Sequence, residues 1–218
     1  FIGSGHRQII SPLIPYDMNL FNIRKGDLIY KDLINVKPKI AYVNEQTYSK
    51  SLINIYKKNL YKALIIDWNN SYSANPNWKN HMQYYPQIAI DDYNNSIDII
   101  WNNSINFQKF QRFIYGEINK KEFLKELKRI KNKNYSFSLY GSDAEIFDYR
   151  PKRFFYEQKD SLQEWKKIGN IFNELENNNF YKLIKISEIL KSVKKNHFKK
   201  KEKITNSKNP IIVKKQSK

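Results

Sequence analysis

The sequence predicts an α/β fold built on a parallel sheet, and two observations support this prediction. Four short segments rich in Ile, Val, Tyr and Phe are typical of strands buried on both faces, at residues 39–45, 62–68, 96–102 and 135–143. Segments with apolar residues at intervals of three and four lie between or after them, as amphipathic helices require. Strands that alternate with helices pair parallel to one another through right-handed crossovers. We therefore expect one parallel sheet within residues 1–190.

The first half of the chain supplies two of these strands. KIAYVNE, at residues 39–45, ends on Glu45 and precedes a helical stripe formed by Tyr48, Leu52, Ile55, Tyr56 and Leu60. KALIIDW, at residues 62–68, ends on Asp67 and Trp68. Residues 70–95 then combine polar, aromatic and turn-forming residues over a length that exceeds a plain connection. We therefore expect a functional loop at residues 70–95.

The second half supplies the other two strands, SIDIIWN at residues 96–102 and YSFSLYGSD at residues 135–143. Two helices are expected after residue 119, and each has the N-cap and reach-back spacing of a capping box, Asn119 with Glu122 and Ser161 with Glu164. Their apolar stripes are Phe123, Leu124, Leu127 and Ile130, and then Leu162, Trp165, Ile168, Phe172 and Leu175.

Composition narrows the class of protein. No run of about 18 apolar residues occurs, so we expect no membrane span. The absence of cysteine excludes disulfides and thiolate metal sites and fits a reducing compartment, so we expect a cytoplasmic protein. His6, His81 and His197 lack any local ligand spacing, and we expect neither a metal nor a cofactor. The chain starts at Phe1 instead of Met, so we expect the natural N-terminus to lie upstream.

The net charge of +18 is concentrated at one end of the chain. Residues 191–218 hold eleven lysines and a single acid, and they lack apolar periodicity, so we expect a flexible lysine-rich tail there. Such a tail is compatible with nucleic-acid binding. The chain is also rich in Asn, Lys, Ile and Tyr, a bias that an AT-rich coding sequence produces whatever the function. We favour this second explanation and do not expect a nucleic-acid partner.

Acidic and amide side chains stand at the carboxyl ends of the expected strands: Glu45, Asp67, Asn102 and Asp143. Functional groups collect at these ends in parallel sheets and barrels. YGSDAEIFDYR, at residues 140–150, places three acids after a buried strand, where carboxylates are costly unless they are paired or do chemistry. Glu45 and Asp143 therefore predict a carboxylate pair across one site, which is the arrangement that glycoside hydrolysis needs.

Three segments carry a resemblance to a known family. GSGHRQIISPLIPYD at residues 3–17, AYVNEQTY at 41–48 and YGSDAEIFD at 140–148 have the order and spacing of three catalytic-domain motifs, and IIWNNSINFQKFQRF at 99–113 is similar to a segment between them. The chain thus resembles glycoside hydrolase family 57 over roughly residues 1–175. The resemblance implies an incomplete (β/α)7-type parallel barrel that lacks its N-terminal strand or strands here, with polysaccharide or oligosaccharide as substrate.

The resemblance also implies roles for two residues. Glu45 falls on the nucleophile and Asp143 on the general acid/base of a retaining enzyme that hydrolyses or transfers α-linked glucan. The sequence departs from the family in three places: no first-strand His motif is present, residues 148–154 run DYRPKRF where the family has Gly-His-Trp, and no fifth motif is evident. Structural alternatives remain, since Glu45 would also start a helix and Asp143 would also pair with Arg150 or Arg153.

Five further residues are candidates for substrate binding, each with a structural alternative: His6, Asp67, Trp68, Trp101 and Asn102. A Gly-Ser-Gly turn precedes His6 and lets the backbone approach a ligand closely, whereas a surface histidine is the commoner outcome. The tryptophans suit stacking on sugar rings but equally suit core packing. Two other functions stay open, a metal-dependent polysaccharide deacetylase-like enzyme and a non-enzymatic nucleic-acid-binding protein.

Overall fold

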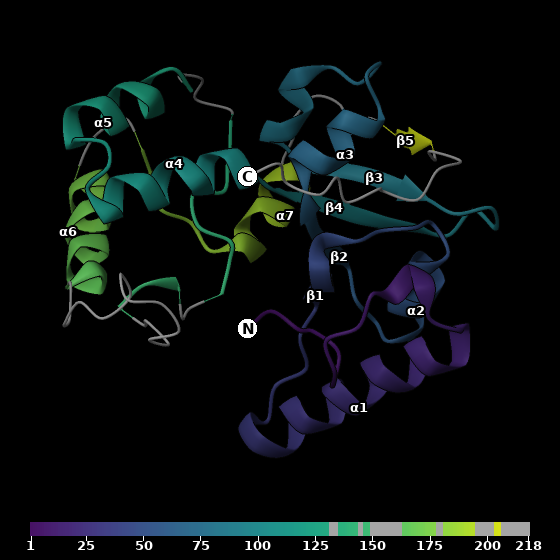
Figure 1. Cartoon of the computed structure of the whole chain (residues 1–218). Helices are drawn as coiled ribbons and strands as arrows, with labels where there is room; N and C mark the ends of the chain where they lie inside the picture. Colours follow the sequence, from purple (N-terminus) through teal and green to yellow (C-terminus); the bar gives the residue numbers. More distant parts are fainter. Residues whose placement is uncertain (131–134, 144–145, 149–162, 178–180, 195–202, 206–218) are drawn as a thin grey trace.

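Figure 1 shows the fold as a computed structural model, which describes residues 1–130, 135–143, 146–148, 163–177, 181–194 and 203–205. Within those residues one sheet has the strand order β1-β2-β4-β3-β5. Parallel pairing joins β1 (Ile40–Tyr42) to β2 (Ala63–Asp67) and β2 to β4 (Ser96–Asn102). β3 (Gln87–Ile90) pairs antiparallel with β4 and parallel with β5 (Lys203–Thr205). The predicted α/β fold with a mostly parallel sheet is confirmed.

The helices connect and cover these strands. They are α1 (Tyr16–Ile34), α2 (Leu52–Lys58), α3 (Trp68–Ala74), α4 (Ser104–Tyr115), α5 (Lys120–Lys128), α6 (Glu164–Glu176) and α7 (Ile186–Lys194). Short 3₁₀ helices occupy Ser11–Leu13, Asn44–Gln46 and Asn80–Tyr84. None of the helices in the described ranges has both the length and the apolar content needed to cross a membrane.

The central strands are buried on both faces, which explains their continuous apolar sequence. On one face Leu64 and Ile66 of β2 join a cluster with side chains of α1, α2 and α3. On the other face Ala63 and Ile65 of β2 pack near Ile189 of α7. Successive strand residues point to opposite faces, so the run ALIID needs an apolar side chain at nearly every position.

A second apolar cluster lies beside the sheet, where Figure 1 shows α4, α5 and α6 gathered together. Its centre is aromatic: Phe110 of α4 is fully buried, and Phe113 stacks on Phe123 of α5 with ring centroids 4.6 Å apart. Gly116 ends α4 in the left-handed conformation (φ 82°), which glycine adopts without strain. The cluster also holds Phe147, so it anchors residues 146–148, which follow Asp143 in the chain.

The start of α5 confirms the expected capping box. The Asn119 side chain accepts a hydrogen bond from the Glu122 N–H, and the Glu122 carboxylate accepts one from the Asn119 N–H. Of the second expected box, Ser161 lies outside the described residues, and Glu164 is the first residue of α6 instead of the third. α6 begins at Glu164, and its first two N–H groups donate to the carboxylate of Asp148 at 2.8 and 2.9 Å. Glu164 in turn accepts from the Asp148 N–H at 2.7 Å.

Two of the sequence predictions are wrong. Residues 135–143 are described but form no strand, because their polar groups bond to side chains and to the Tyr84 carbonyl instead of to a neighbouring strand. The functional loop expected at residues 70–95 is not a loop throughout, since this stretch contains most of α3, a 3₁₀ helix and β3. β3 and β4 form a hairpin whose turn is organised by the Asp91 carboxylate, which accepts from the N–H groups of Tyr93 and Asn95.

The expected lysine-rich tail contains regular secondary structure in two places. α7 continues through Lys194, and Lys203–Thr205 form β5 in the sheet. The remainder of residues 191–218 lies outside the described ranges, so the prediction of a flexible tail applies only to that remainder.

Candidate active site

The site is built at one edge of the sheet, where the parallel strands β1, β2 and β4 have their carboxyl ends. Tyr42 is the last residue of β1, Asp67 the last of β2 and Asn102 the last of β4. The register pairs Asp67 with Asn102, so these two ends lie side by side. Glu45 follows three residues after Tyr42. The expected convergence of strand ends therefore exists in the structure.

Residue Gly141 brings the fourth predicted segment to this edge. Its carbonyl accepts a hydrogen bond from the Tyr42 hydroxyl at 3.0 Å and another from Asn102 Nδ2 at 3.0 Å. Asn102 Nδ2 also lies 3.3 Å from the Tyr42 hydroxyl oxygen, and Asn102 Oδ1 accepts from the Ser138 hydroxyl at 2.9 Å. We call these four residues, Tyr42, Asn102, Ser138 and Gly141, the Gly141 anchor. The anchor fixes the backbone two residues before Asp143.

The pKa of the Tyr42 hydroxyl is affected by the carboxylates near this edge. Burial raises the pKa of Tyr42 to about 12, and the charges of Asp67 and Asp143 add to this shift. Gln46 opposes it, and the charge of Glu45 makes the smallest addition. Coulombic effects on a single hydroxyl fall off with distance. Glu45 and Asp143, which are 98 positions apart in the sequence, thus both contribute to raising the pKa of Tyr42.

Glu45 is held in a strained backbone conformation. It lies in the 3₁₀ turn Asn44–Gln46 with φ 54° and ψ 14°, and Gln46 has φ 55°. A side chain in this left-handed region costs about 1–3 kcal/mol, and such strain concentrates at functional sites. The exposed Glu45 carboxylate accepts a hydrogen bond from Gln8 Nε2. The Glu45 carboxylate is thus both oriented and open to solvent.

The N-terminal segment that supplies Gln8 is clamped to α1 and to the loop after β1. The Asn22 side chain accepts from the Arg7 N–H at 2.7 Å and donates to the Arg7 carbonyl at 3.1 Å. Asn44 also donates to that carbonyl, and its Oδ1 accepts from the Ser4 hydroxyl at 2.7 Å. This clamp explains why the segment 3–17, which sequence analysis assigned to a motif, lies against Glu45.

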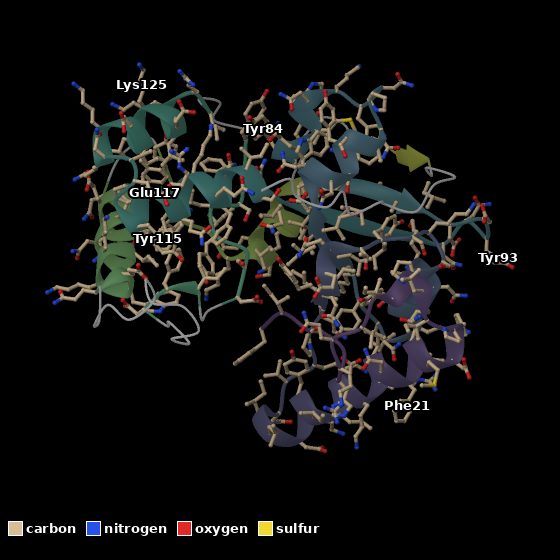
Figure 2. The ribbon with its side chains drawn as sticks, in the orientation of Figure 1. Phe21, Tyr84, Tyr93, Tyr115, Glu117 and Lys125 are labelled. Atoms are coloured by element: carbon tan, nitrogen blue, oxygen red, sulfur yellow. The ribbon has the colours of Figure 1, made fainter. Side chains whose placement is uncertain are left out.

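Asp143 has an exposed side chain on a fixed backbone. Its carbonyl accepts a 2.9 Å hydrogen bond from the Tyr140 hydroxyl. The chain just beyond is held by the Tyr115 hydroxyl, which donates to the Ile146 carbonyl at 2.9 Å; Tyr115 lies on α4 in Figure 2. The ion pair considered with Arg150 involves a residue outside the described ranges.

The other candidate residues at the strand ends have structural contacts. Asp67 caps α3 by accepting from the Asn70 N–H and also accepts from the Ser104 N–H, which ties β2 to the start of α4. Trp68 is 1% exposed and lies 5.1 Å from Trp101, ring centre to ring centre. These contacts support the packing interpretation of Asp67, Trp68 and Trp101, and Asn102 acts within the Gly141 anchor.

His6 has an exposed side chain, and its N–H donates to the Asn22 carbonyl at 3.0 Å. Sequence reasoning missed Gln8, Tyr42 and Gly141. The only signal for Gly141 was its place before Asp143 in a segment without other glycines, and nothing in the sequence paired Tyr42 with it. Among the described residues, no three His, Asp or Glu side chains come together as metal ligands would, so the metal-dependent alternative has no ligand set there.

Comparisons with known proteins agree with this geometry. The profile of glycosyl hydrolase family 57 matches residues 1–206. Among curated protein sequences, none matches this chain significantly. Two solved structures share the fold with a TM-score of 0.68: the 4-alpha-glucanotransferase of Thermococcus litoralis at 15% identity and the alpha-amylase AmyC of Thermotoga maritima at 10% identity. The matches cover 87% and 96% of this chain but only 28% and 50% of those two chains.

Proposed function

Because the chain belongs to glycosyl hydrolase family 57, we propose that it acts on α-linked glucan or a related polysaccharide, as a retaining glycoside hydrolase or glucanotransferase. In this proposal Glu45 is the nucleophile and Asp143 the general acid/base. The observation that carries the proposal is the hydrogen bond from the Tyr42 hydroxyl to the Gly141 carbonyl, which joins the segment of Glu45 to the segment of Asp143 at the carboxyl edge of the sheet. The names of the two structural neighbours, a glucanotransferase and an amylase, support an α-glucan as the substrate.

The proposed chemistry has two steps. In the first, Glu45 attacks the anomeric carbon while Asp143 protonates the leaving oxygen, so the glycosidic bond breaks and a glycosyl ester forms on Glu45. In the second, the Asp143 carboxylate removes a proton from the incoming hydroxyl, which displaces Glu45. Water as the acceptor gives hydrolysis, and a sugar hydroxyl gives transfer. The mechanism requires carboxyl groups about 5–5.5 Å apart on opposite sides of the scissile bond.

The structure supports these roles through access and orientation. Both carboxylates are exposed, whereas Asp67, the other acid at this edge, is buried and engaged with two N–H groups. Gln8 orients Glu45, and the Gly141 anchor fixes the backbone that leads to Asp143. We also propose a barrel-type fold for the intact domain. In this proposal β1, β2 and β4, with the helices between them, correspond to successive βα units of an incomplete (β/α)7-type barrel.

Substitution of the two carboxylates tests the proposal. Glu45→Gln and Asp143→Asn should each lower the turnover of soluble starch or maltooligosaccharides by at least about 10²-fold, because each removes a group that acts in the transition state. Glu117→Gln is the matched control, since Glu117 is an exposed acid that pairs with Arg112 away from this edge. If either site variant keeps wild-type turnover, the assignment of Glu45 and Asp143 as the catalytic pair is wrong.

A further inference from the structure

We propose that Tyr42 is a positioning residue, whose hydroxyl fixes the backbone before Asp143 and thereby sets the place of the acid/base carboxyl relative to Glu45. The inference rests on the proposed function and adds to it a residue that does not react itself. Tyr42 connects the segments that carry the two carboxylates, one through the chain and the other through a hydrogen bond. It shares a chain segment with Glu45 and bonds to the segment that carries Asp143.

The geometry gives Tyr42 this role. It ends β1, which is paired with β2 over Ile40, Ala41 and Tyr42 itself, so its backbone is part of the sheet. Its hydroxyl donates to the Gly141 carbonyl at 3.0 Å, across 99 positions of sequence. A rigid strand on one side and a directed hydrogen bond on the other couple the position of Gly141 to that of β1.

The segment that Tyr42 holds depends on such side-chain bonds. Residues 135–143 form no strand. Their hydrogen bonds to the rest of the fold are made largely with the side chains of Tyr42, Asn102 and Asn106, and with the Tyr84 carbonyl, which accepts from the Ser136 N–H. Figure 2 labels Tyr84, whose ring also stacks on that of Tyr135 at 4.2 Å. That stack fixes the start of the segment. Near its end, the Gly141 carbonyl is the group that receives two of these bonds.

The chemistry of the phenol suits a permanent donor. Its pKa is raised to about 12 by burial and by the surrounding carboxylates, so the hydroxyl keeps its proton throughout the neutral range. The proton is directed to the Gly141 carbonyl, and the oxygen faces Asn102 Nδ2. Tyr42 therefore acts through the position of Gly141 and Asp143, and not by giving a proton to substrate.

Two substrates that differ in leaving group provide the test. A misplaced acid should slow only the substrate whose leaving group needs a proton, whereas a damaged fold should slow both. Cleavage of a maltooligosaccharide needs protonation of the leaving oxygen, whereas fluoride departs from α-glucosyl fluoride without it. We expect Tyr42→Phe to lower kcat/KM for maltooligosaccharide by about tenfold or more, within the range of general acid catalysis, and for α-glucosyl fluoride by less than about twofold. The ratio kcat/KM is used because it covers the steps from substrate binding to formation of the glycosyl ester and leaves out the breakdown of that ester.

Tyr61→Phe is the matched control. Tyr61 is also buried and donates a hydroxyl hydrogen bond, at 2.6 Å to Asp27, but lies away from both carboxylates. It should change kcat/KM for the two substrates by the same factor. Asp143→Asn should show the same selectivity as Tyr42→Phe and a larger loss.

The outcomes separate the two proposals. If Tyr42→Phe lowers kcat/KM for both substrates equally, or for neither, the positioning role is refuted, while a selective loss in Asp143→Asn leaves the proposed function standing. All variants are made in the intact protein, because the chain spans only part of the length of its structural neighbours. If Asp143→Asn also shows no selectivity, or if the intact wild-type protein cleaves neither substrate, the proposed function fails and the inference about Tyr42 fails with it. Thermal unfolding of each variant identifies a loss that arises from the fold.

Discussion

Gly141 lies so close to Asn102 that a β-carbon at this position would stand 2.2 Å from Asn102 Oδ1 and 2.7 Å from its Cγ. Real β-carbons do not approach other atoms this closely, so only glycine fits here unless Asn102 moves. Asn102 is 4% exposed and is bonded to Tyr42, Ser138 and the Gly141 carbonyl. The last residue of β4 and the segment leading to Asp143 are therefore in direct contact.

This contact predicts the effect of Gly141→Ala. The added methyl group must displace the Asn102 amide or the 135–143 segment, and overpacking of this kind costs about 1–3 kcal/mol. We expect the free energy of unfolding to fall by that amount and glucan turnover to fall further than the instability explains. Chemical denaturation and starch hydrolysis measure the two effects.

Gly169→Ala is the control for this change. Gly169 lies within α6, and a β-carbon there would meet no atom within 4 Å. Since alanine is the better helix former by about 1 kcal/mol, this variant should be more stable than the wild type and equally active. A Gly141→Ala protein as stable and active as the wild type would show that the close approach to Asn102 has no consequence.

The reciprocal bonds between Asp148 and Glu164 predict a second effect. Asp148→Ala removes the acceptor for the first two N–H groups of α6 and should lower stability by about 1–2 kcal/mol, as lost helix caps do. It should also reduce glucan turnover, because Asp148 joins the chain that follows Asp143 to a rigid helix. Asn119→Ala removes the cap of α5 and should cost similar stability with no further loss of turnover. Equal turnover in the two variants, after correction for stability, would contradict this prediction.

The hydrogen bond from Gln8 to Glu45 predicts a change in pH dependence. Gln8→Glu places a second negative charge beside the Glu45 carboxylate and opposes its ionisation. Because the proposed nucleophile must be ionised, the acidic limb of the pH–rate profile should move to higher pH. Gln108→Glu, at an exposed position of α4, should leave the profile unchanged. An unshifted acidic limb in Gln8→Glu would show that Gln8 does not influence the reacting group.

The buried tyrosines predict alkaline sensitivity of the fold. Burial raises the pKa of Tyr42 to about 12 and raises the pKa values of Tyr48 and Tyr56 above the ordinary value of 10. Between pH 10 and 12 the unfolded chain loses these protons while the folded chain keeps them, so stability should fall as pH rises. Below pH 10 these groups should contribute no pH dependence.

Denaturation at a series of pH values measures this effect. Tyr56→Phe should make the decline above pH 10 less steep, whereas Tyr93→Phe should not, because the Tyr93 side chain is 83% exposed. A decline of unchanged slope in Tyr56→Phe would contradict the assignment of the alkaline effect to buried tyrosines.

The sequence predicted the parts of the fold that follow from local pattern. Three of four expected strands formed, at 39–45, 62–68 and 96–102, because their apolar runs are buried on both faces. The segment 135–143 has a strand-like composition for a different reason. Phe137 and Leu139 pack in the α4–α6 cluster, while Ser136 and Ser138 bond to Tyr84 and Asn102. Alternating apolar and polar residues indicate that one side of a segment is packed in a core and the other is hydrogen-bonded. A strand in a sheet has this arrangement, but so does an extended segment such as 135–143 that pairs with no strand.

Other features carried weak or misleading patterns. The 19-residue helix α1 was not predicted, because its buried face includes Asn19, Asn22 and Gly26, whereas Phe21 points to solvent (Figure 2). The hairpin of β3 and β4 did have a signal, a polar turn at residues 91–95 between two apolar runs. Partners such as Tyr42 and Gly141 could not be predicted, since their contact depends on how distant segments meet.

The most direct test of the account is to trap the glycosyl ester in the Asp143→Asn variant. With α-glucosyl fluoride the first step needs no acid, and the second is slow without the base, so the ester should accumulate. Peptide mapping by mass spectrometry should find the added glucosyl group on Glu45. A glucosyl group on any other residue, or turnover of the fluoride that Glu45→Gln leaves intact, would contradict the pairing of Glu45 with Asp143.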